Sequence, residues 1–380
     1  MNSVVTNKKK DGDELTFTIS GLNVSFVNAI RRTIVSDIPI AVFKTFPYDE
    51  SDCVIHKNTT RFNNEILKQR LSCIPILIDV DDKPIKNLVL KVKHANNTTE
   101  TQYLTTKQFN IYDESTKQYL PDSLRDSIFP ANNISKNYID FVRLRPGYFQ
   151  PNNTKTIIGE EIDFECKMSL GMANMNAMFN VVSMVAFSNT TVPKEQLDVH
   201  FENYKNSTKK ENLSTSEQDI AEADWFVLNA KRHFIPDSFD FKMNTICVYD
   251  CEHLLSKAIT IIINKFKVLI DPSLHNPYNI STQISKNNTF YQNCYDIVLQ
   301  NESYTIGKII EHVLFSECVE AEVPTMSFVS FLKEHPHFSY SIIRVVFVDD
   351  TTEQEVIELL HEKFQHIIQI YEHIKGIMVG

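Results

Sequence analysis

The sequence predicts an α+β fold in which two similar units, each a small sheet bearing two helices, pack together as an internal pseudo-dimer. Three observations lead to this prediction. A strand–turn–helix pattern near the start of the chain returns near its end. Each copy is completed by a strand and a long helix that is too apolar to be exposed. Residues 45–178 consist of short β-type runs separated by polar residues, which adds a β-rich inserted domain to the first unit.

The first unit begins with an alternating strand over Leu15–Ser20, followed by turn residues and candidate helix caps at Gly21–Ser25. A helix is expected next, because apolar residues recur at i, i+3 and i+7. Its predicted apolar stripe is Val27, Ile30 and Ile34. Arg31 and Arg32 fall toward the polar side of the same helix.

The expected domain boundaries follow from shifts in composition along the chain. They are 1–44 and 179–270 for the first unit, 45–178 for the inserted domain, 271–292 for a linker and 293–380 for the second unit. Residues 188–243 are polar and are expected to form an irregular excursion from the first unit. The linker contains two prolines and several Asn and Ser residues, which disfavour a continuous helix or strand.

A strongly apolar helix closes the first unit and a long amphipathic helix closes the second. The first has the stripe Leu255, Ile259, Ile262 and Phe266, and the second includes Leu360, Phe364 and Ile367. An offset of 279 carries the early stripe of Val27, Ile30 and Ile34 onto Ile306, Ile309 and Val313. Stripes this broad must be covered by another element. We therefore predict that these thirteen residues form the seam between the two units.

Composition argues against several classes of function. The formal net charge is −10, and the basic clusters are short, so extensive direct contact with nucleic acid is not expected. The 8 glycines do not have the spacing of a phosphate-binding loop. Residues 1–20 lack an apolar run of signal-peptide length, and charged or polar residues interrupt the most apolar run, so neither secretion nor membrane insertion is expected.

Cysteine and histidine patterns do not predict a metal or a catalytic site. The 7 cysteines are scattered, and the close pair Cys247 and Cys251 has no second pair to complete a zinc site. His361 and His366 are five residues apart on a predicted helix, so they face about 140° apart and cannot share one ion. We expect reduced thiols, no cofactor and no metal.

Two motifs in the first half resemble a known family. Val24–Phe43 contains Asn-Ala-Ile-Arg-Arg followed by Asp-Ile-Pro, and Asn58–Ile76 contains Glu-Ile-Leu-Lys-Gln-Arg-Leu-Ser-Cys-Ile-Pro. In this order and at this separation they resemble the signature segments of the alpha-like subunits of multisubunit RNA polymerases. The motifs are quite specific, and the resemblance over the whole chain covers roughly residues 15–80, 140–190, 245–270 and 293–375.

The end of the chain resembles the small partner of that family. Asn301–Ile310 resembles its Glu-Asp-His-Thr-Leu-Gly-Asn-Leu-Leu motif, and Phe331–His337 resembles its Tyr-x-x-x-His-Pro segment. The resemblance therefore implies a fusion of the large and small alpha-like subunits. Such fusions are characteristic of large cytoplasmic DNA viruses, and the Asn- and Ile-rich composition agrees with this source. By that analogy the protein would be found in the virion and the host cytoplasm.

The resemblance also implies partners and residue roles. It implies a noncatalytic assembly platform that binds the largest and second-largest polymerase subunits and a small zinc-bearing subunit, without forming a homo-oligomer. Asn28, Arg31 and Arg32 are the first candidates for partner binding, since paired guanidinium groups make bidentate contacts to carboxylates. Glu65 and Arg70 are the second. Both sets remain open to other interpretations: a solvated helix face for the first and an internal ion pair for the second.

Two other classes of function remain as alternatives. A cysteine- or metal-dependent hydrolase is disfavoured by the missing side-chain constellations. A self-contained structural protein that reuses the same fold would retain the apolar seam but would not bind polymerase subunits.

Overall fold

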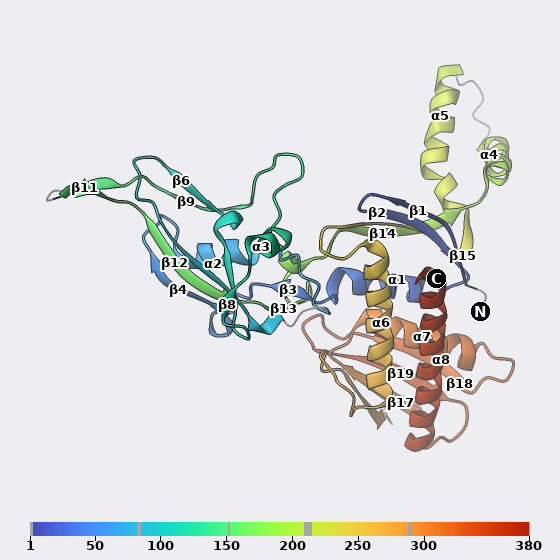
Figure 1. Cartoon of the computed structure of the whole chain (residues 1–380). Helices are drawn as coiled ribbons and strands as arrows, with labels where there is room; N and C mark the ends of the chain where they lie inside the picture. Colours follow the sequence, from blue (N-terminus) through green and yellow to red (C-terminus); the bar gives the residue numbers. More distant parts are fainter. Residues whose placement is uncertain (1–2, 82–84, 151–152, 209–214, 288–290, 380) are drawn as a thin grey trace. The chain divides into compact units, whose positions relative to one another are not determined.

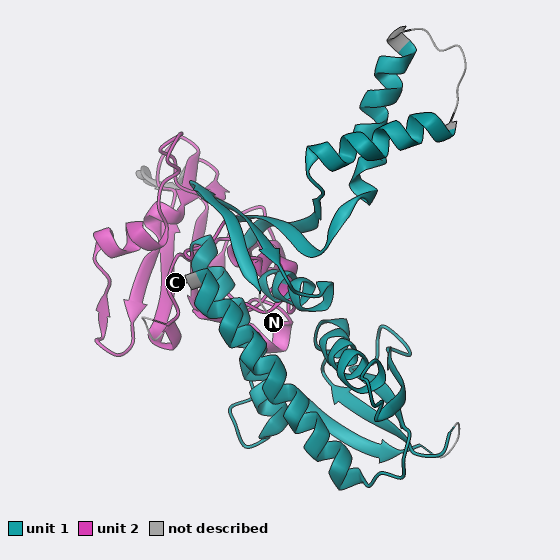
Figure 2. Ribbon diagram, turned by 90° about the vertical axis from the view of Figure 1, so that its right-hand side faces the viewer, with its two compact units in different colours: residues 1–35, 182–245, 250–380 teal, residues 36–181, 246–249 magenta. Residues whose placement is uncertain are grey.

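The computed structural model describes residues 3–81, 85–150, 153–208, 215–287 and 291–379. The chain divides into two compact units, shown in different colours in Figure 2. Unit 1 contains residues 1–35, 182–245 and 250–380, and unit 2 contains residues 36–181 and 246–249. Within the described residues, no helix combines the length and the apolar composition needed to cross a membrane.

The first sheet of unit 1 takes its strands from two distant parts of the chain. It is antiparallel, with the order β1-β2-β15-β14 (Figure 1). The strands are β1 (Val4–Asp11), β2 (Glu14–Ser20), β14 (Val182–Thr191) and β15 (Phe234–Thr245). Helix α1 (Val24–Ser36) follows β2, and helix α6 (Cys251–Ile270) follows β15. The Asp250 carboxylate caps α6 by accepting a hydrogen bond from the backbone N–H of His253 at 2.8 Å.

The C-terminal part of unit 1 has the same arrangement. Its sheet has the order β16-β17-β19-β18. The elements are β16 (Ser281–Lys286), β17 (Cys294–Gln300), α7 (Tyr304–Leu314), β18 (Met326–Leu332), β19 (Tyr340–Phe347) and α8 (Glu353–Val379). Strand β16 lies within residues 271–292, which were expected to be a linker. Because β16 pairs with β17 from Ser281 to Lys286, part of that segment belongs to the sheet.

The register of the repeat differs by one residue from the predicted offset of 279. An offset of 280 carries β2 onto β17 with both ends matched, and it carries the first residue of α1, Val24, onto the first residue of α7, Tyr304. The turns agree, since Gly21 (φ 79°) and Asn301 (φ 54°) both have positive φ at the same place. A broad apolar stripe fits either offset, because i+3 and i+4 neighbours share one helix face. The strand ends and the turn therefore set the register.

Helices from the two repeats pack against each other within unit 1. Helix α6 lies along α8, and the ring centroid of Phe266 is 5.6 Å from that of Phe364. Tyr371 of α8 reaches α1, where its ring lies 5.7 Å from Phe26 and its hydroxyl donates to the Phe26 carbonyl at 3.1 Å. Burial raises the pKa of Tyr371 well above its ordinary value, so the side chain remains a neutral donor.

Residues 188–243 contain regular elements, unlike the irregular excursion that was expected. Between β14 and β15 the chain forms helices α4 (Lys194–Thr208) and α5 (Thr215–Leu228), which stand away from the sheet in Figures 1 and 2. Phe201, Trp225 and Ala230 form a small core, with the two aromatic rings 5.1 Å apart. Few residues of these helices are buried, which explains why their sequence reads as polar and without periodicity.

Unit 2 contains a five-stranded sheet with the order β4-β12-β5-β7-β8. Its strands are β4 (Cys53–Asn58), β5 (Leu88–Ala95), β7 (Asn110–Asp113), β8 (Gln118–Tyr119) and β12 (Glu161–Lys167). Two-stranded sheets pair β3 (Ile40–Val42) with β13 (Ser169–Gly171), β6 (Gln102–Thr105) with β9 (Asp140–Leu144), and β10 (Tyr148–Gln150) with β11 (Asn153–Ile158). The helices are α2 (Asn64–Ser72) and α3 (Asp122–Ile128). Phe109 lies at the centre of an aromatic core, with its ring 5.5 Å from Phe129 and 5.7 Å from Phe141.

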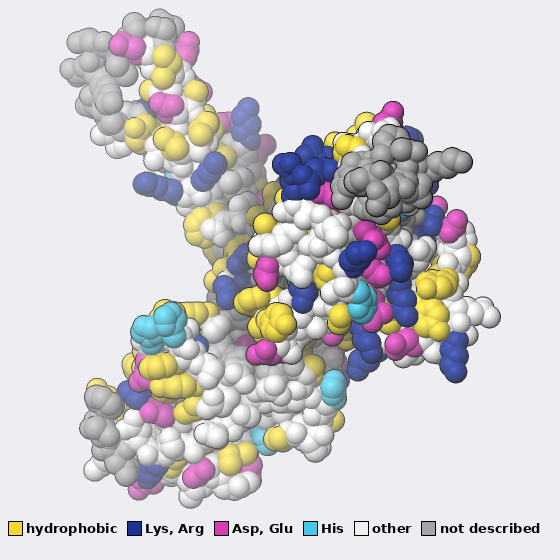
Figure 3. All heavy atoms as spheres, turned by 90° about the vertical axis from the view of Figure 1, so that its left-hand side faces the viewer, with side chains coloured by type: hydrophobic (Ala, Val, Ile, Leu, Met, Phe, Trp, Pro, Cys, Tyr) yellow, Lys and Arg dark blue, Asp and Glu magenta, His cyan; other side chains and the backbone are white. Residues whose placement is uncertain are grey.

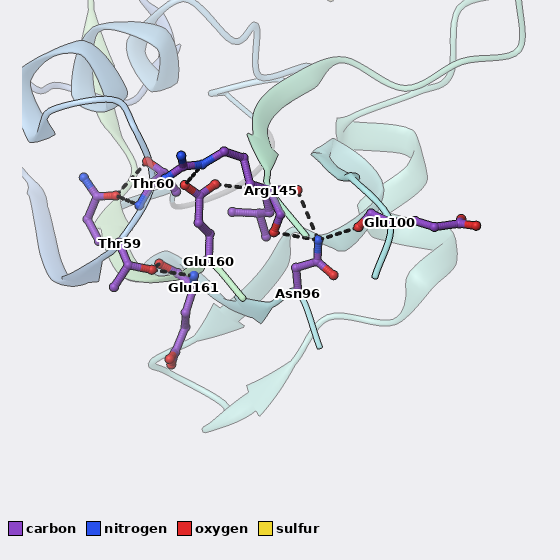
Figure 4. A network of polar contacts seen from close by, with 9 residues as sticks. Thr59, Thr60, Asn96, Glu100, Arg145, Glu160 and Glu161 are labelled. Atoms are coloured by element: carbon purple, nitrogen blue, oxygen red, sulfur yellow. Dashed lines mark hydrogen bonds and ion pairs between the residues drawn. The ribbon is translucent and has the colours of Figure 1, made fainter. Parts of the chain in front are cut away.

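A buried polar network closes the base of the β10–β11 hairpin (Figure 4). The side-chain nitrogen of Asn96, which is fully buried, lies 2.8–3.1 Å from the carbonyl oxygens of Glu100, Leu144 and Arg145. The Glu160 carboxylate accepts a hydrogen bond from the backbone N–H of Arg145 at 2.7 Å and pairs with its guanidinium. Because these groups satisfy one another, the chain ends entering and leaving the hairpin are held together.

Charged side chains on unit 2 alternate in sign. Cross-strand ion pairs join Lys57 to Glu161 at 2.6 Å and Lys93 to Asp163 at 3.4 Å. Figure 3 shows Lys and Arg side chains interleaved with Asp and Glu side chains on this part of the surface. Exposed pairs like these contribute about 0–1 kcal/mol each to stability. Their mixed signs do not give this face the strongly positive potential that a phosphate backbone would favour.

Candidate assembly interface

Helix α1 places the first predicted partner-binding residues opposite a buried stripe. The buried side chains are Phe26, Val27, Ala29, Ile30, Thr33 and Ile34. Asn28, Arg31 and Arg32 lie along the remaining edge and are half-buried. The helix starts after Asn23, whose side-chain oxygen accepts a hydrogen bond from the backbone N–H of Ser25 at 2.9 Å. Because the opposite face is packed, the backbone under this edge is held in place.

The two guanidinium groups have different partners. Arg31 Nε donates to Asn28 Oδ1 at 2.9 Å on the same helix, and Arg32 Nε donates to the Thr305 hydroxyl at 2.7 Å on α7. No ion pair in the part of the chain that the structure describes includes Arg31. Burial and the charge of Arg32 lower the pKa of Arg31. Arginine side chains carry a positive charge in proteins. Two cations therefore lie close together along this edge, and an incoming carboxylate would stabilise them.

A cleft of about 400 Å³ opens beside this edge, between α1 and the first turns of α7. Its lining residues are Val24, Ser25, Asn28, Ala29, Arg32, Tyr304, Thr305 and Lys308. Tyr304 is 52% exposed and Val24 is 46% exposed, so apolar surface borders the cationic groups. Lys308 is paired with Glu311 on its own helix. Aromatic and aliphatic surface beside arginine is the composition found at the centre of protein–protein interfaces.

Tyr304, Thr305 and Lys308 are residues of this cleft that the sequence analysis missed. At the offset of 280 they correspond to Val24, Ser25 and Asn28, so matching positions of the two repeats line the same cleft. The repeat itself is the signal that could have found them. At the predicted offset of 279, however, Asn28 corresponds to Gly307, which does not line the cleft, so the equivalence of the lining residues is not seen.

The predicted seam residues are all buried in unit 1. Each of Val27, Ile30, Ile34, Leu255, Ile259, Ile262, Phe266, Ile306, Ile309, Val313, Leu360, Phe364 and Ile367 is at most 3% exposed. Two buried aromatic residues that join α1 to α8, Phe26 and Tyr371, were not among the predicted residues. Their contact is not visible in a helical stripe, because it depends on where two distant helices cross.

Polar contacts that have no signature in the sequence also join the two repeats. Lys265 of α6 pairs with Glu302, just before α7, at 2.7 Å, and the side chains are only 6% and 5% exposed. Lys375 Nζ on α8 donates to the Thr260 hydroxyl on α6 at 2.8 Å. Separating a buried ion pair would leave two uncompensated charges away from water, which is energetically costly. The Lys265–Glu302 pair therefore fixes α6 relative to the start of α7.

Glu65 and Arg70 form a separate candidate surface on α2 of unit 2. Arg70 Nε donates to the carbonyl of Phe141 at 2.7 Å, and Nη2 donates to that of Asp140 at 3.0 Å. Arg70 therefore ties α2 to β9, and the ion pairs among the described residues do not include one between Arg70 and Glu65. Glu65 is exposed and lines a second cleft of about 510 Å³ together with Lys68.

His366, one of the two histidines considered as metal ligands, has a structural partner. His366 Nδ1 lies 2.7 Å from Glu317 Oε1, and Lys363 Nζ lies 3.1 Å from the other oxygen of the same carboxylate. Within the described ranges, no three His, Cys, Asp or Glu side chains are grouped closely enough to hold a metal ion. The seven cysteines are all free thiols.

Comparisons with known proteins match this chain to RNA polymerase subunits. The family described as the RNA polymerase Rpb3/Rpb11 dimerisation domain matches residues 16–266. The DNA-directed RNA polymerase subunit Rpo3 of Methanosphaera stadtmanae is 24% identical over 191 residues, which is 50% of this chain and 62% of that protein. Rpo3 of Pyrococcus horikoshii is 37% identical over 73 residues, 19% of this chain and 26% of that protein.

A eukaryotic protein also matches. The mouse protein named DNA-directed RNA polymerases I and III subunit RPAC1 is 26% identical over 196 residues, 47% of this chain and 51% of that protein. The chain therefore spans less than two thirds of the length of each of these relatives.

Proposed function

Since this chain belongs to the RNA polymerase Rpb3/Rpb11 dimerisation domain family, we propose that it is a noncatalytic assembly-platform subunit of a DNA-directed RNA polymerase. In this proposal the chain fuses the large and small alpha-like subunits. The observation that carries the proposal is the internal repeat, in which two sheets of identical strand order each bear two helices. The family match ends at residue 266, and the second copy of the arrangement follows it in the chain.

The two repeats act as an internal pseudo-dimer in this proposal. The contacts of Phe266 with Phe364 and of Phe26 with Tyr371, together with the buried Lys265–Glu302 pair, support it. A fused chain brings the two halves together intramolecularly, so their pairing does not depend on protein concentration. Unit 2, which follows α1 in the sequence, is the inserted β-rich domain of the first half.

The edge of α1 is the proposed docking point for the second-largest polymerase subunit. Arg31 and Arg32 would receive carboxylates of that subunit, with Asn28 and the cleft beside it accepting neighbouring side chains. Glu65 and Arg70 on α2 are the second proposed contact, and Arg70 also holds α2 to β9. The largest subunit and a small zinc-bearing subunit are the other proposed partners. By analogy with fused subunits, we place the chain in the virion and host cytoplasm of a large DNA virus.

Affinity purification of the tagged chain from cells that assemble the polymerase tests this function. The proposal expects both very large subunits to be recovered in stoichiometric amounts. Arg31→Ala plus Arg32→Ala should lower recovery of the second-largest subunit at least tenfold, which corresponds to about 1.4 kcal/mol or more. Thermal unfolding of the isolated variant should show that it remains folded.

A matched control removes two lysines from a different surface. Lys57→Ala plus Lys93→Ala makes the same change in charge at exposed ion pairs of unit 2 and should leave recovery unchanged. Equal recovery from both double variants would refute the role of the arginines. If the tagged chain is recovered without any large polymerase subunit, the result would favour a self-contained structural protein. Hydrolytic activity of the isolated chain would favour the enzyme alternative.

A further inference from the structure

We propose that Cys53 and Cys166 are a modification site, at which a peroxide-class oxidant reversibly joins two buried thiols into a cross-strand disulfide within unit 2. This inference does not depend on the polymerase assignment.

The strand register brings the two cysteines face to face. Cys53 of β4 is the direct partner of Cys166 of β12 in an antiparallel pair. The backbone N–H of Lys167 donates to the Asp52 carbonyl at 3.1 Å, which makes that neighbouring pair a hydrogen-bonded one. Hydrogen-bonded and non-hydrogen-bonded pairs alternate, so Cys53 and Cys166 form a non-hydrogen-bonded pair with Cα atoms about 4.5 Å apart. This separation falls within the range of roughly 4.4–6.8 Å that disulfides span.

The two thiols differ in their access to solvent. Cys166 is fully buried, whereas Cys53 is 3% exposed and lines the cleft of about 510 Å³ beside α2. Ser51 and Lys68 line the same cleft, and Lys68 Nζ donates to the Ser51 hydroxyl at 3.1 Å. A molecule as small as hydrogen peroxide can reach Cys53 from this side, whereas Cys166 does not line the cleft and has no exposed surface.

The electrostatic surroundings assign different roles to the two sulfur atoms. A hydrogen bond from Cys166 and the nearby charge of Lys68 lower the pKa of the Cys53 thiol, against the opposing effect of burial. The hydrogen bond to Cys53 and burial raise the pKa of Cys166. Thiolates are the nucleophiles in thiol oxidation. Because Cys53 lines the cleft and Cys166 has no exposed surface, Cys53 is the thiol that attacks and Cys166 is the one that resolves.

The reaction balances with hydrogen peroxide as the only co-reactant. The Cys53 thiolate attacks a peroxide oxygen, the O–O bond breaks, and protonation of the leaving hydroxide gives water and a Cys53 sulfenic acid. The Cys166 sulfur then attacks the sulfenyl sulfur, forming the S–S bond, and its proton leaves with the displaced hydroxyl as a second water. The two thiols lose two electrons and two hydrogens in total, and a dithiol reductant reverses the change.

The disulfide would fix an edge strand of the sheet. Strand β4 is the outermost strand, and the chain continues from it into α2. Joining β4 covalently to β12 would restrict fraying at this edge and would close a long loop in the unfolded chain. The unfolding midpoint of the oxidised chain should therefore rise, by roughly 5–10 °C.

Peptide mapping of the full chain after brief treatment with hydrogen peroxide tests the proposal. The expected main product is a peptide pair linked through Cys53 and Cys166 that is two hydrogens lighter than its reduced form and is restored by dithiothreitol. Cys73 is exposed and should be replaced by serine in all samples, so that it does not form links between molecules. Disulfide formation must also be faster than global unfolding, measured in parallel by hydrogen exchange.

Two variants separate the proposed roles. Cys166→Ser should leave a sulfenic acid on Cys53 that dimedone traps, and Lys68→Met should slow disulfide formation roughly 3–10-fold without changing which cysteines pair. If Cys166→Ser does not fold, dimedone trapping of Cys53 in the parent chain replaces it. The proposal is overturned if both thiols remain alkylatable after peroxide treatment, or if they react only at the rate of global unfolding. An unchanged rate in Lys68→Met overturns the role of the lysine.

Discussion

Lys265→Met removes one half of a buried ion pair between the two repeats, and its cost can be worked from the structure. Lys265 Nζ and Glu302 Oε1 are 2.7 Å apart, and both side chains are about 95% buried (6% and 5% exposed). A charge left without its partner in such surroundings costs about 3–5 kcal/mol. Methionine keeps most of the lysine volume, so a packing cavity adds little. We therefore expect the free energy of unfolding to fall by about 3–5 kcal/mol, and Glu302→Gln to produce a loss in the same direction.

The double variant makes the test specific to the pair. With Lys265→Met and Glu302→Gln together, no charge remains uncompensated, and the loss should be smaller than the sum of the single losses by about 2 kcal/mol or more. Urea unfolding of the four proteins, followed by circular dichroism, measures this coupling energy. Additive losses would show that the two side chains do not interact, and would refute the placement of α6 against the start of α7.

Three further predictions follow from single contacts. Asp296→Asn should destabilise the chain by about 1–3 kcal/mol at pH 7, because hydrogen bonds from Arg344 at 2.7 and 2.8 Å lower the pKa of Asp296. This stabilisation is present above the pKa of Asp296 in the unfolded chain, and it is lost as the pH falls through the lower pKa of the folded chain. Urea unfolding should therefore show that the difference in unfolding free energy between the parent chain and Asp296→Asn narrows below about pH 4. A difference that does not narrow as the pH falls below about 4 would contradict this. Gly159→Ala should lower the thermal unfolding midpoint, because the added Cβ would lie 2.0 Å from a backbone oxygen. Gly376→Ala is the control: its Cβ would meet nothing within 4 Å, so the midpoint should not fall. Tyr371→Phe should cost about 1 kcal/mol in urea unfolding by removing one buried hydrogen bond, and no loss would mean that water replaces it.

Helical periodicity predicted burial well and packing partners poorly. The stripes that include Ile30, Ile259 and Phe364 are buried, because a 3.6-residue repeat reports directly which face of a helix avoids water. The same periodicity is compatible with repeat offsets of both 279 and 280, so it did not reveal that the predicted offset was wrong by one residue. With the wrong offset, Thr305 and Lys308 were not recognised as residues that line the same cleft as Asn28. The strand ends and positive-φ turns that set the correct register contain little hydrophobic signal.

Other features could not be predicted because they depend on distant segments meeting. The partners of Arg70 are backbone carbonyls of β9, which have no side-chain signature in the sequence. Lys265 and Glu302 are charged residues that would ordinarily be placed on the surface, and only the fold brings them together in a buried position. Helices α4 and α5 bury so few residues that their polar composition resembled a loop.

Cutting the chain between α6 and β16 tests most directly whether the two repeats pack against each other. A protease recognition sequence inserted after the exposed Ser273 would separate the first repeat from the second and would lie outside α6 and α8, whose contacts join the repeats. The pseudo-dimer predicts that the two fragments still co-elute as one species on size exclusion at micromolar concentration and separate only in denaturant. Fragments that elute independently under native conditions, beside an intact uncut control, would contradict it.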